Sequence, residues 1–66
     1  MLYAIEIFKL NVKEYPEAFN PYDSLGEAYM IDGQKELVVK NYAKSLELNP
    51  NNAGAIKMLS KILESD

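Results

Sequence analysis

The sequence predicts an all-α protein whose helical hairpins stack into an α-α superhelix. Three observations support this fold class. Apolar residues recur at three- and four-residue spacing along most of the chain, as on a helix that buries one face. Residues that end helices interrupt the pattern at Pro16, at Asp32-Gly33 and at Pro50. Three positions also recur with one period of 34 residues, which pairs Ala4 with Val38, Phe8 with Tyr42 and Pro16 with Pro50.

The pattern predicts four helices that together hold at least about 65% of the chain. We expect them near residues 2–14, 21–32, 35–48 and 53–64. In the first helix, Ile5 lies beside a stripe formed by Ala4, Phe8 and Val12. Tyr15-Pro16 ends this helix, because the residue before a Pro disfavours the helical conformation.

The second helix has its apolar face at i, i+3, i+4 and i+7, which are Tyr22, Leu25, Gly26 and Tyr29. Asn20 is a suitable N-cap, Pro21 suits the first helical position, and Asp23 falls in the first turn. Gly33 can adopt the left-handed conformation that closes a helix. Gly26 costs about 1 kcal/mol relative to Ala in mid-helix. We therefore expect another helix to cross closely over Gly26.

The third helix has a second apolar stripe, which ends before Pro50 and consists of Leu37, Val38, Tyr42, Ser45 and Leu46. The Asp32-Gly33 pair before it also occurs in β-hairpins, but the flanking residues have a helical period and no alternation. Asn51 and Asn52 are candidate N-caps of a fourth helix that repeats the second. With the same period, Tyr22 corresponds to Ile56, Leu25 to Leu59, Gly26 to Ser60 and Tyr29 to Leu63.

Residues 19–52 resemble one tetratricopeptide repeat. The family pattern reads aromatic-x2-Leu-Gly-x2-Tyr, then small-x3-aromatic, then Pro, and here it is formed by Tyr22, Leu25, Gly26, Tyr29, Val38, Tyr42 and Pro50. The resemblance implies one domain, with residues 1–18 as the second helix of a preceding repeat and residues 53–66 as the first helix of a following one. The sequence departs from the pattern at Asn11 and Ser45, where the family prefers Ala, and at Ile56 and Ser60. The family function is a non-catalytic scaffold for protein–protein interaction.

A looser resemblance links Leu10–Pro16 and Tyr22–Tyr29 to short repeat segments at the C-terminal ends of some bacterial serine-hydrolase and esterase-like proteins. It implies the alternative that the chain is an appendage of a larger enzyme and serves assembly or stability. The chain begins in mid-repeat, so we also expect either a fragment or another surface that supplies the missing helix. The stack is shorter than the about three repeats that such arrays need for stability.

Composition narrows the classes of function. The net charge of −3, without any Arg, argues against a nucleic-acid partner and against anionic membranes. No apolar run reaches the about 18 residues of a membrane span, and residues 1–5 lack the basic start of a secretory signal. A soluble, cytoplasmic chain is the default expectation. Because the chain has no Cys, no His and no phosphate- or calcium-binding loop, we expect no enzyme, no cofactor and no metal site.

One face of the second and fourth helices is a candidate peptide-binding groove, formed by Asn20, Asp23, Glu27, Met30, Lys57 and Lys61. In the tetratricopeptide family these positions line the concave surface, and in some members lysines there hold a peptide's terminal carboxylate. Lys57 and Lys61 partly resemble that arrangement, whereas Asp23 and Glu27 reverse its charge. The resemblance therefore implies a groove with an acidic and a basic half. Alternatively, Asp23 pairs with Lys57 and Glu27 with Lys61, each worth about 0–1 kcal/mol, without any ligand.

The terminal helices also predict self-association, because each lacks the partner helix that a repeat would supply. We expect exposed apolar stripes at the two ends of the chain, formed by Ala4, Ile5, Phe8, Ile56, Leu59, Ile62 and Leu63. The last helix of one chain could then accept the first helix of another. Closed symmetric dimers are commoner than open assemblies. The expected partner is therefore a protein or a peptide, with a homodimer favoured.

Overall fold

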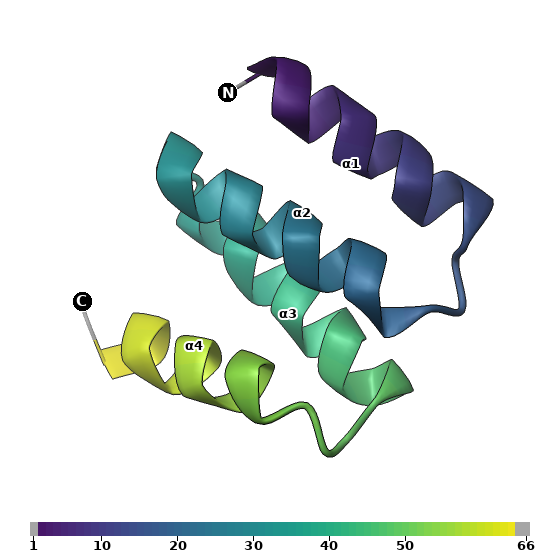
Figure 1. Cartoon of the computed structure of the whole chain (residues 1–66). Helices are drawn as coiled ribbons and strands as arrows, with labels where there is room; N and C mark the ends of the chain where they lie inside the picture. The colour runs from purple at the N-terminus through teal and green to yellow at the C-terminus, as the bar shows by residue number, and fades with distance from the viewer. Residues whose placement is uncertain (1, 65–66) are drawn as a thin grey trace.

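The computed structural model of the chain describes residues 2–64, which form four α-helices joined by short loops (Figure 1). The helices are α1 (Leu2–Glu14), α2 (Phe19–Asp32), α3 (Lys35–Leu48) and α4 (Ala53–Glu64). They contain 84% of the described residues, and no strand occurs in this part of the chain. The all-α fold class and the four predicted helices are confirmed.

The helices stack in the order of the chain. The main contacts join α1 to α2, α2 to α3 and α3 to α4, and Figure 1 shows α1 and α4 on opposite sides of the α2–α3 hairpin. The Cα atoms span 31 × 26 × 14 Å. The smallest of these dimensions fits two helix layers whose axes are about 10 Å apart. Packing mainly between sequence neighbours is typical of architectures that grow by adding repeats.

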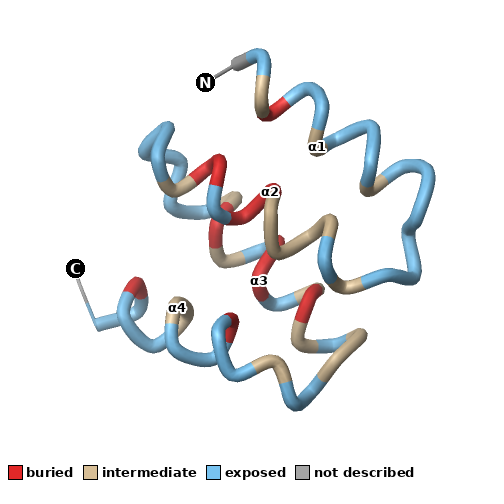
Figure 2. The backbone as a smooth tube through the Cα atoms, viewed as in Figure 1, coloured by how far each residue is buried: buried red, intermediate tan, exposed pale blue. Residues whose placement is uncertain are grey.

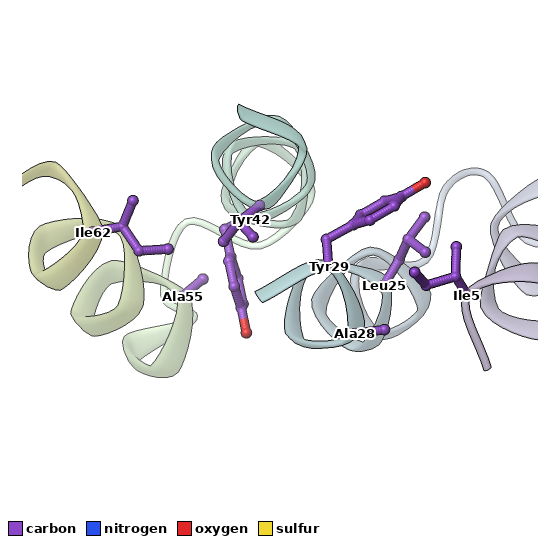
Figure 3. Close-up of a cluster of buried hydrophobic side chains, with 8 residues drawn as sticks. Ile5, Leu25, Ala28, Tyr29, Tyr42, Ala55 and Ile62 are labelled. Atoms are coloured by element: carbon purple, nitrogen blue, oxygen red, sulfur yellow. The ribbon is translucent and has the colours of Figure 1, made fainter. Parts of the chain in front are cut away.

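The core lies mainly in the α2–α3 hairpin, and α1 and α4 are largely exposed (Figure 2). The buried apolar side chains are Ile5, Leu25, Ala28, Tyr29, Val38, Tyr42, Ala55 and Ile62. Of the two predicted stripes on α2 and α3, Tyr22, Leu37 and Leu46 are half-buried, and the remaining positions are buried. Figure 3 shows Ile5 of α1 facing Leu25 of α2, which is how the first helix is attached to the hairpin.

The close crossing predicted at Gly26 is confirmed. A Cβ atom at this position would lie 3.0 Å from Cδ2 and Cε2 of Tyr42 and 3.3 Å from its Cζ. The Tyr42 ring of α3 therefore rests directly on the α2 backbone and is only 3% exposed. A side chain larger than hydrogen would push this ring away, which explains why a residue unfavourable in mid-helix occupies position 26.

Gly33 ends α2 as the sequence predicts. Its φ of 81° is the left-handed conformation, which glycine adopts without steric cost. The Gly33 N–H donates to the Met30 carbonyl at 3.1 Å, and the Gln34 N–H donates to the Tyr29 carbonyl at 3.0 Å. This pair of bonds is a Schellman motif, which satisfies carbonyls that the end of a helix leaves without partners.

The start of α2 differs from the prediction that Asn20 is the N-cap. The helix begins at Phe19, and the preceding residue, Ala18, has an extended backbone and no side-chain capping bond. Pro21 is consequently the third helical residue, and Asp23 lies beyond the first turn. The prediction was wrong because the first four N–H groups of any helix lack an intrahelical acceptor. A proline is therefore tolerated throughout the first turn and does not fix where the helix begins.

Asn52 connects three helices at the start of α4. Its carbonyl accepts the Ile56 N–H at 3.1 Å, and its Oδ1 accepts the Ala55 N–H at 3.3 Å, which makes it the predicted N-cap. Its Nδ2 donates to Ser45 Oγ at 2.9 Å and to Asp23 Oδ2 at 3.5 Å. The Ser45 hydroxyl, fully buried, donates in turn to the Phe19 carbonyl at 3.2 Å. This junction satisfies the polar groups of Ser45, the position where the repeat pattern prefers Ala.

Candidate functional site

The six residues of the predicted groove differ in how far they are exposed. Asn20, Glu27, Lys57 and Lys61 are exposed, whereas Asp23 and Met30 are half-buried. Asp23 is held at the junction by the Asn52 amide. Met30 packs against the core and lines a cleft of about 270 Å³ with Val38 and Ile62. A peptide-binding role for this face stays a prediction.

The Tyr42 hydroxyl belongs to the same face, although the sequence indicated only a core role for this residue. In Figure 3 its side chain extends from α3 between α2 and α4, with the hydroxyl directed away from α3. Burial, and to a smaller extent the negative charges of Asp23 and Glu27, raise the pKa of Tyr42 to about 12. The neutral phenol is therefore stabilised next to two carboxylates. Sequence spacing gave no signal for this proximity, because it depends on how the ring lies on Gly26.

The expected ion pairs of Asp23 with Lys57 and of Glu27 with Lys61 do not form. The ion pairs within residues 2–64 join Lys9 to Glu6 and Lys44 to Glu47, each within one helix. The physical reason lies in the packing order, since α4 rests mainly on α3 rather than on α2. The carboxylates of Asp23 and Glu27 are therefore not within ion-pair distance of Lys57 and Lys61. The two lysines on α4 remain exposed, and the like-charge pairs of each helix are not relieved in this way.

The exposed apolar stripe of α1 differs from the predicted one. Ile5 is buried against α2, and Phe8 packs on the core, so neither lies on the outer surface of the stack. The large apolar side chains exposed on α1 are Tyr3, Ile7 and Leu10, whose exposed fractions are 80%, 42% and 60%. Their spacing of four and three residues places them on one face of the helix. We name these three residues the N-terminal stripe.

The exposed apolar residues of α4 agree better with the sequence-based prediction than those of α1. Ile56 and Leu63 are 48% and 70% exposed, and Leu59 between them is half-buried. These three residues are named the C-terminal stripe. Ile62, also expected on the outside, is buried, because Ala55 and Ile62 form the face of α4 that packs on α3. The sequence signal for this inner face was the seven-residue spacing of Ala55 and Ile62, which places both on one side of a helix.

Other classes of site find little support in the described residues. No group of three or more acidic side chains in residues 2–64 is placed to hold a metal ion. No helix in that range is both long and apolar enough to cross a membrane. Comparison with models of known protein families, with curated proteins and with solved structures gave no match.

Proposed function

We propose that the chain is a non-catalytic protein–protein interaction module of the tetratricopeptide-repeat type. Two features support this assignment. The helices pack in chain order, as repeats do. The residues that form the repeat pattern also lie in the core, since Leu25, Tyr29 and Val38 are buried and Gly26 contacts Tyr42.

The interaction that we propose is self-association through the two ends of the stack. The main supporting observation is that α1 and α4 each expose large apolar side chains, which are Tyr3, Ile7 and Leu10 on α1 and Ile56 and Leu63 on α4. In a longer array these sides would be covered by the preceding and the following helix. The N-terminal stripe of one chain is chemically suited to the C-terminal stripe of another, because both are apolar and about two helical turns long. Reciprocal pairing about a two-fold axis closes a homodimer.

Multi-angle light scattering across a concentration series tests this proposal. We expect the molar mass to approach that of a dimer as concentration rises, because burial of apolar area contributes about 25 cal/mol per Å². The unfolding midpoint should rise over the same concentration range, since association stabilises the folded state. A chain that stays monomeric and cooperatively folded at high micromolar concentration would contradict self-association. A growing distribution of masses would instead indicate one-directional stacking into an open superhelix.

A further inference from the structure

A continuous cleft runs along the side of the stack where α1 and α3 flank α2. One part has a volume of about 330 Å³ and the other about 470 Å³. Tyr22, Lys40 and Asn41 line both parts, which therefore form one surface. Each part has the size of a small ligand site, for which about 300–1,000 Å³ is usual. We name it the lysine cleft, because its borders carry Lys9, Lys13, Lys40 and Lys44.

The floor of the lysine cleft is apolar. Val12 of α1, Leu25 of α2 and Leu37 of α3 line it, and all three are buried or half-buried. The Tyr22 ring lies between the two parts, and its hydroxyl is fixed by donation to the Pro16 carbonyl at 3.0 Å. An apolar side chain entering the cleft would therefore meet a preformed apolar surface.

The borders of the cleft concentrate positive charge on an acidic protein. They hold four of the seven basic residues of a chain whose net charge is −3, and Glu47 is the one acidic residue among the described residues that line the cleft. Lys13 and Lys40 form no ion pair with any residue in the described range. Lys9 and Lys44 pair with Glu6 and Glu47 at 3.7 and 3.3 Å, and all four side chains are exposed. Exposed ion pairs of this kind contribute little to stability, so carboxylates of a ligand could replace them.

Two polar groups of the cleft have hydrogen-bonding capacity that the described residues do not use. Asn41 is only 8% exposed, and its Nδ2 donates to the Leu37 carbonyl at 2.8 Å. This bond fixes the amide orientation, because a carbonyl oxygen can only accept. Asn41 Oδ1 therefore accepts no hydrogen bond within residues 2–64. The Tyr29 hydroxyl also forms no hydrogen bond in this range. No enclosed side-chain polar atom in this range lacks a partner, so both groups must reach the surface of the cleft.

We propose that the lysine cleft binds an extended acidic peptide segment that carries an apolar side chain. The apolar side chain would occupy the floor, and Asn41 Oδ1 would accept a peptide N–H of the bound segment. Lysines at i and i+4 of one helix are about 6 Å apart at Cβ. Carboxylates at alternate positions of an extended chain repeat after about 6.6 Å. Each lysine row therefore matches every second side chain of such a peptide.

This site is separate from the self-association surfaces. On α1, Lys9 and Lys13 lie on a different side of the helix from the N-terminal stripe, and α4 does not line the cleft. Peptide binding and dimer formation can therefore succeed or fail independently. The proposal specifies a peptide rather than a nucleic acid, because the floor is apolar and the chain offers no Arg for phosphate recognition.

Fluorescence anisotropy with a labelled short peptide tests the proposal. The peptide has glutamates at alternate positions on either side of a central leucine. We expect saturable binding, and about tenfold weaker binding for the Lys40→Glu variant, because a charge next to the ligand is reversed. The matched control is Lys35→Glu, which makes the same change in net charge on the same helix outside the cleft and should leave the affinity within about twofold. Circular dichroism checks that both variants are helical.

Two further ligands, a serine peptide and an oligonucleotide, test the specificity of binding. A peptide with serine in place of the central leucine should bind about tenfold more weakly, since it leaves the apolar floor uncovered. A single-stranded oligonucleotide of equal charge should bind more weakly than the leucine peptide. Equal losses in both lysine variants, equal binding of the serine peptide, or tighter binding of the oligonucleotide would each overturn the proposal. If Lys40→Glu fails to fold, Lys40→Ala compared with Lys35→Ala provides the same test.

Discussion

The contact between Gly26 and Tyr42 determines how closely α2 and α3 approach. Replacing Gly26 with Ala gains about 1 kcal/mol of helix propensity, but it places a Cβ 3.0 Å from the Tyr42 ring. Overpacking of this kind costs about 1–3 kcal/mol. We therefore expect Gly26→Ala to be no more stable than the parent and up to about 2 kcal/mol less stable, as measured by urea unfolding.

Gly54 provides the matched control, because it is also helical but not covered by a ring. A Cβ at Gly54 would meet only Asn52 Oδ1, at 3.5 Å, which is an ordinary contact. Gly54→Ala should therefore keep the propensity gain and stabilise the fold by up to about 1 kcal/mol. Equal stabilisation by the two substitutions would show that Tyr42 does not rest on Gly26.

We expect ionisation of the Tyr42 hydroxyl to lower the stability of the fold at alkaline pH. Its pKa is about 12 in the folded chain, against an ordinary value of 10.0. The folded state therefore holds this proton more tightly than the unfolded state between these two values. The contribution to stability is complete below pH 10.0 and is lost as the pH rises to about 12. We expect the thermal unfolding midpoint of the parent to fall more steeply over this range than that of Tyr42→Phe.

The Tyr42→Phe variant separates the effect of the hydroxyl from the effect of the ring. It keeps the contact with Gly26 and removes an O–H that donates to no residue in the described range, so its stability at neutral pH should change by about 0.5 kcal/mol or less. Lysine titration affects parent and variant alike and cancels in the comparison. Parallel pH profiles would mean that neither burial nor the Asp23 and Glu27 carboxylates raise the pKa of this hydroxyl.

At the scale of the elements, α4 depends on the Asn52 junction. Asn52→Ala removes the N-cap bond to Ala55 and the bond to the buried Ser45 hydroxyl. We expect a loss of about 1–2 kcal/mol in the free energy of unfolding. Hydrogen exchange should quicken in α4 more than in α2 or α3, because the cap holds this helix in place.

Asn51 is the control for the capping prediction. Its side chain is exposed, and only its backbone N–H takes part in the junction, donating to Asn49 Oδ1 at 3.3 Å. Asn51→Ala should change stability by about 0.5 kcal/mol or less. If both substitutions destabilised the chain equally, the specific role of the Asn52 side chain would be refuted.

The helices could be predicted from sequence wherever apolar residues occupy a single face. On α2 and α3 the stripes are narrow, so Leu25, Tyr29, Val38 and Tyr42 could be assigned to the core in advance. α1 instead has apolar residues on nearly all sides, and periodicity alone does not say which side packs. In the structure Ile5 packs on the α2–α3 hairpin, so this side of α1 is buried. Tyr3, Ile7 and Leu10 are consequently exposed.

The candidate sites were harder to predict than the fold, because they depend on distances between helices. The pairing of Asp23 with Lys57 requires a relative placement of α2 and α4 that no repeat pattern specifies. The lysine cleft combines residues of α1 and α3 that are far apart in sequence, such as Lys13 and Lys40. Each pair of lysines is spaced by one helical turn in the sequence, but only the packing of α1 and α3 around α2 brings the pairs to one surface.

At the scale of the whole molecule, the stack is open at both ends. Each helix packs mainly on its neighbours in the chain, so α1 and α4 each have one packed side and one apolar exposed side. The core of so short a chain is small, and single domains of this size bury only about 60% of their unfolded surface. Covering the N- and C-terminal stripes would therefore raise stability as well as change the oligomeric state.

A glutamate on each stripe tests this arrangement. Leu10 and Leu63 are 60% and 70% exposed, so Leu10→Glu and Leu63→Glu should leave the monomer fold intact. In a dimer each would bury a charge against the partner's apolar stripe, at a cost of several kcal/mol. We expect either substitution to shift the chain to the monomer in light scattering and to lower its unfolding midpoint. Ile31→Glu is the control, because Ile31 is 65% exposed on α2, outside both stripes. A dimer that survives both stripe substitutions, or one that Ile31→Glu dissociates equally, would show that the chains do not pair through these ends.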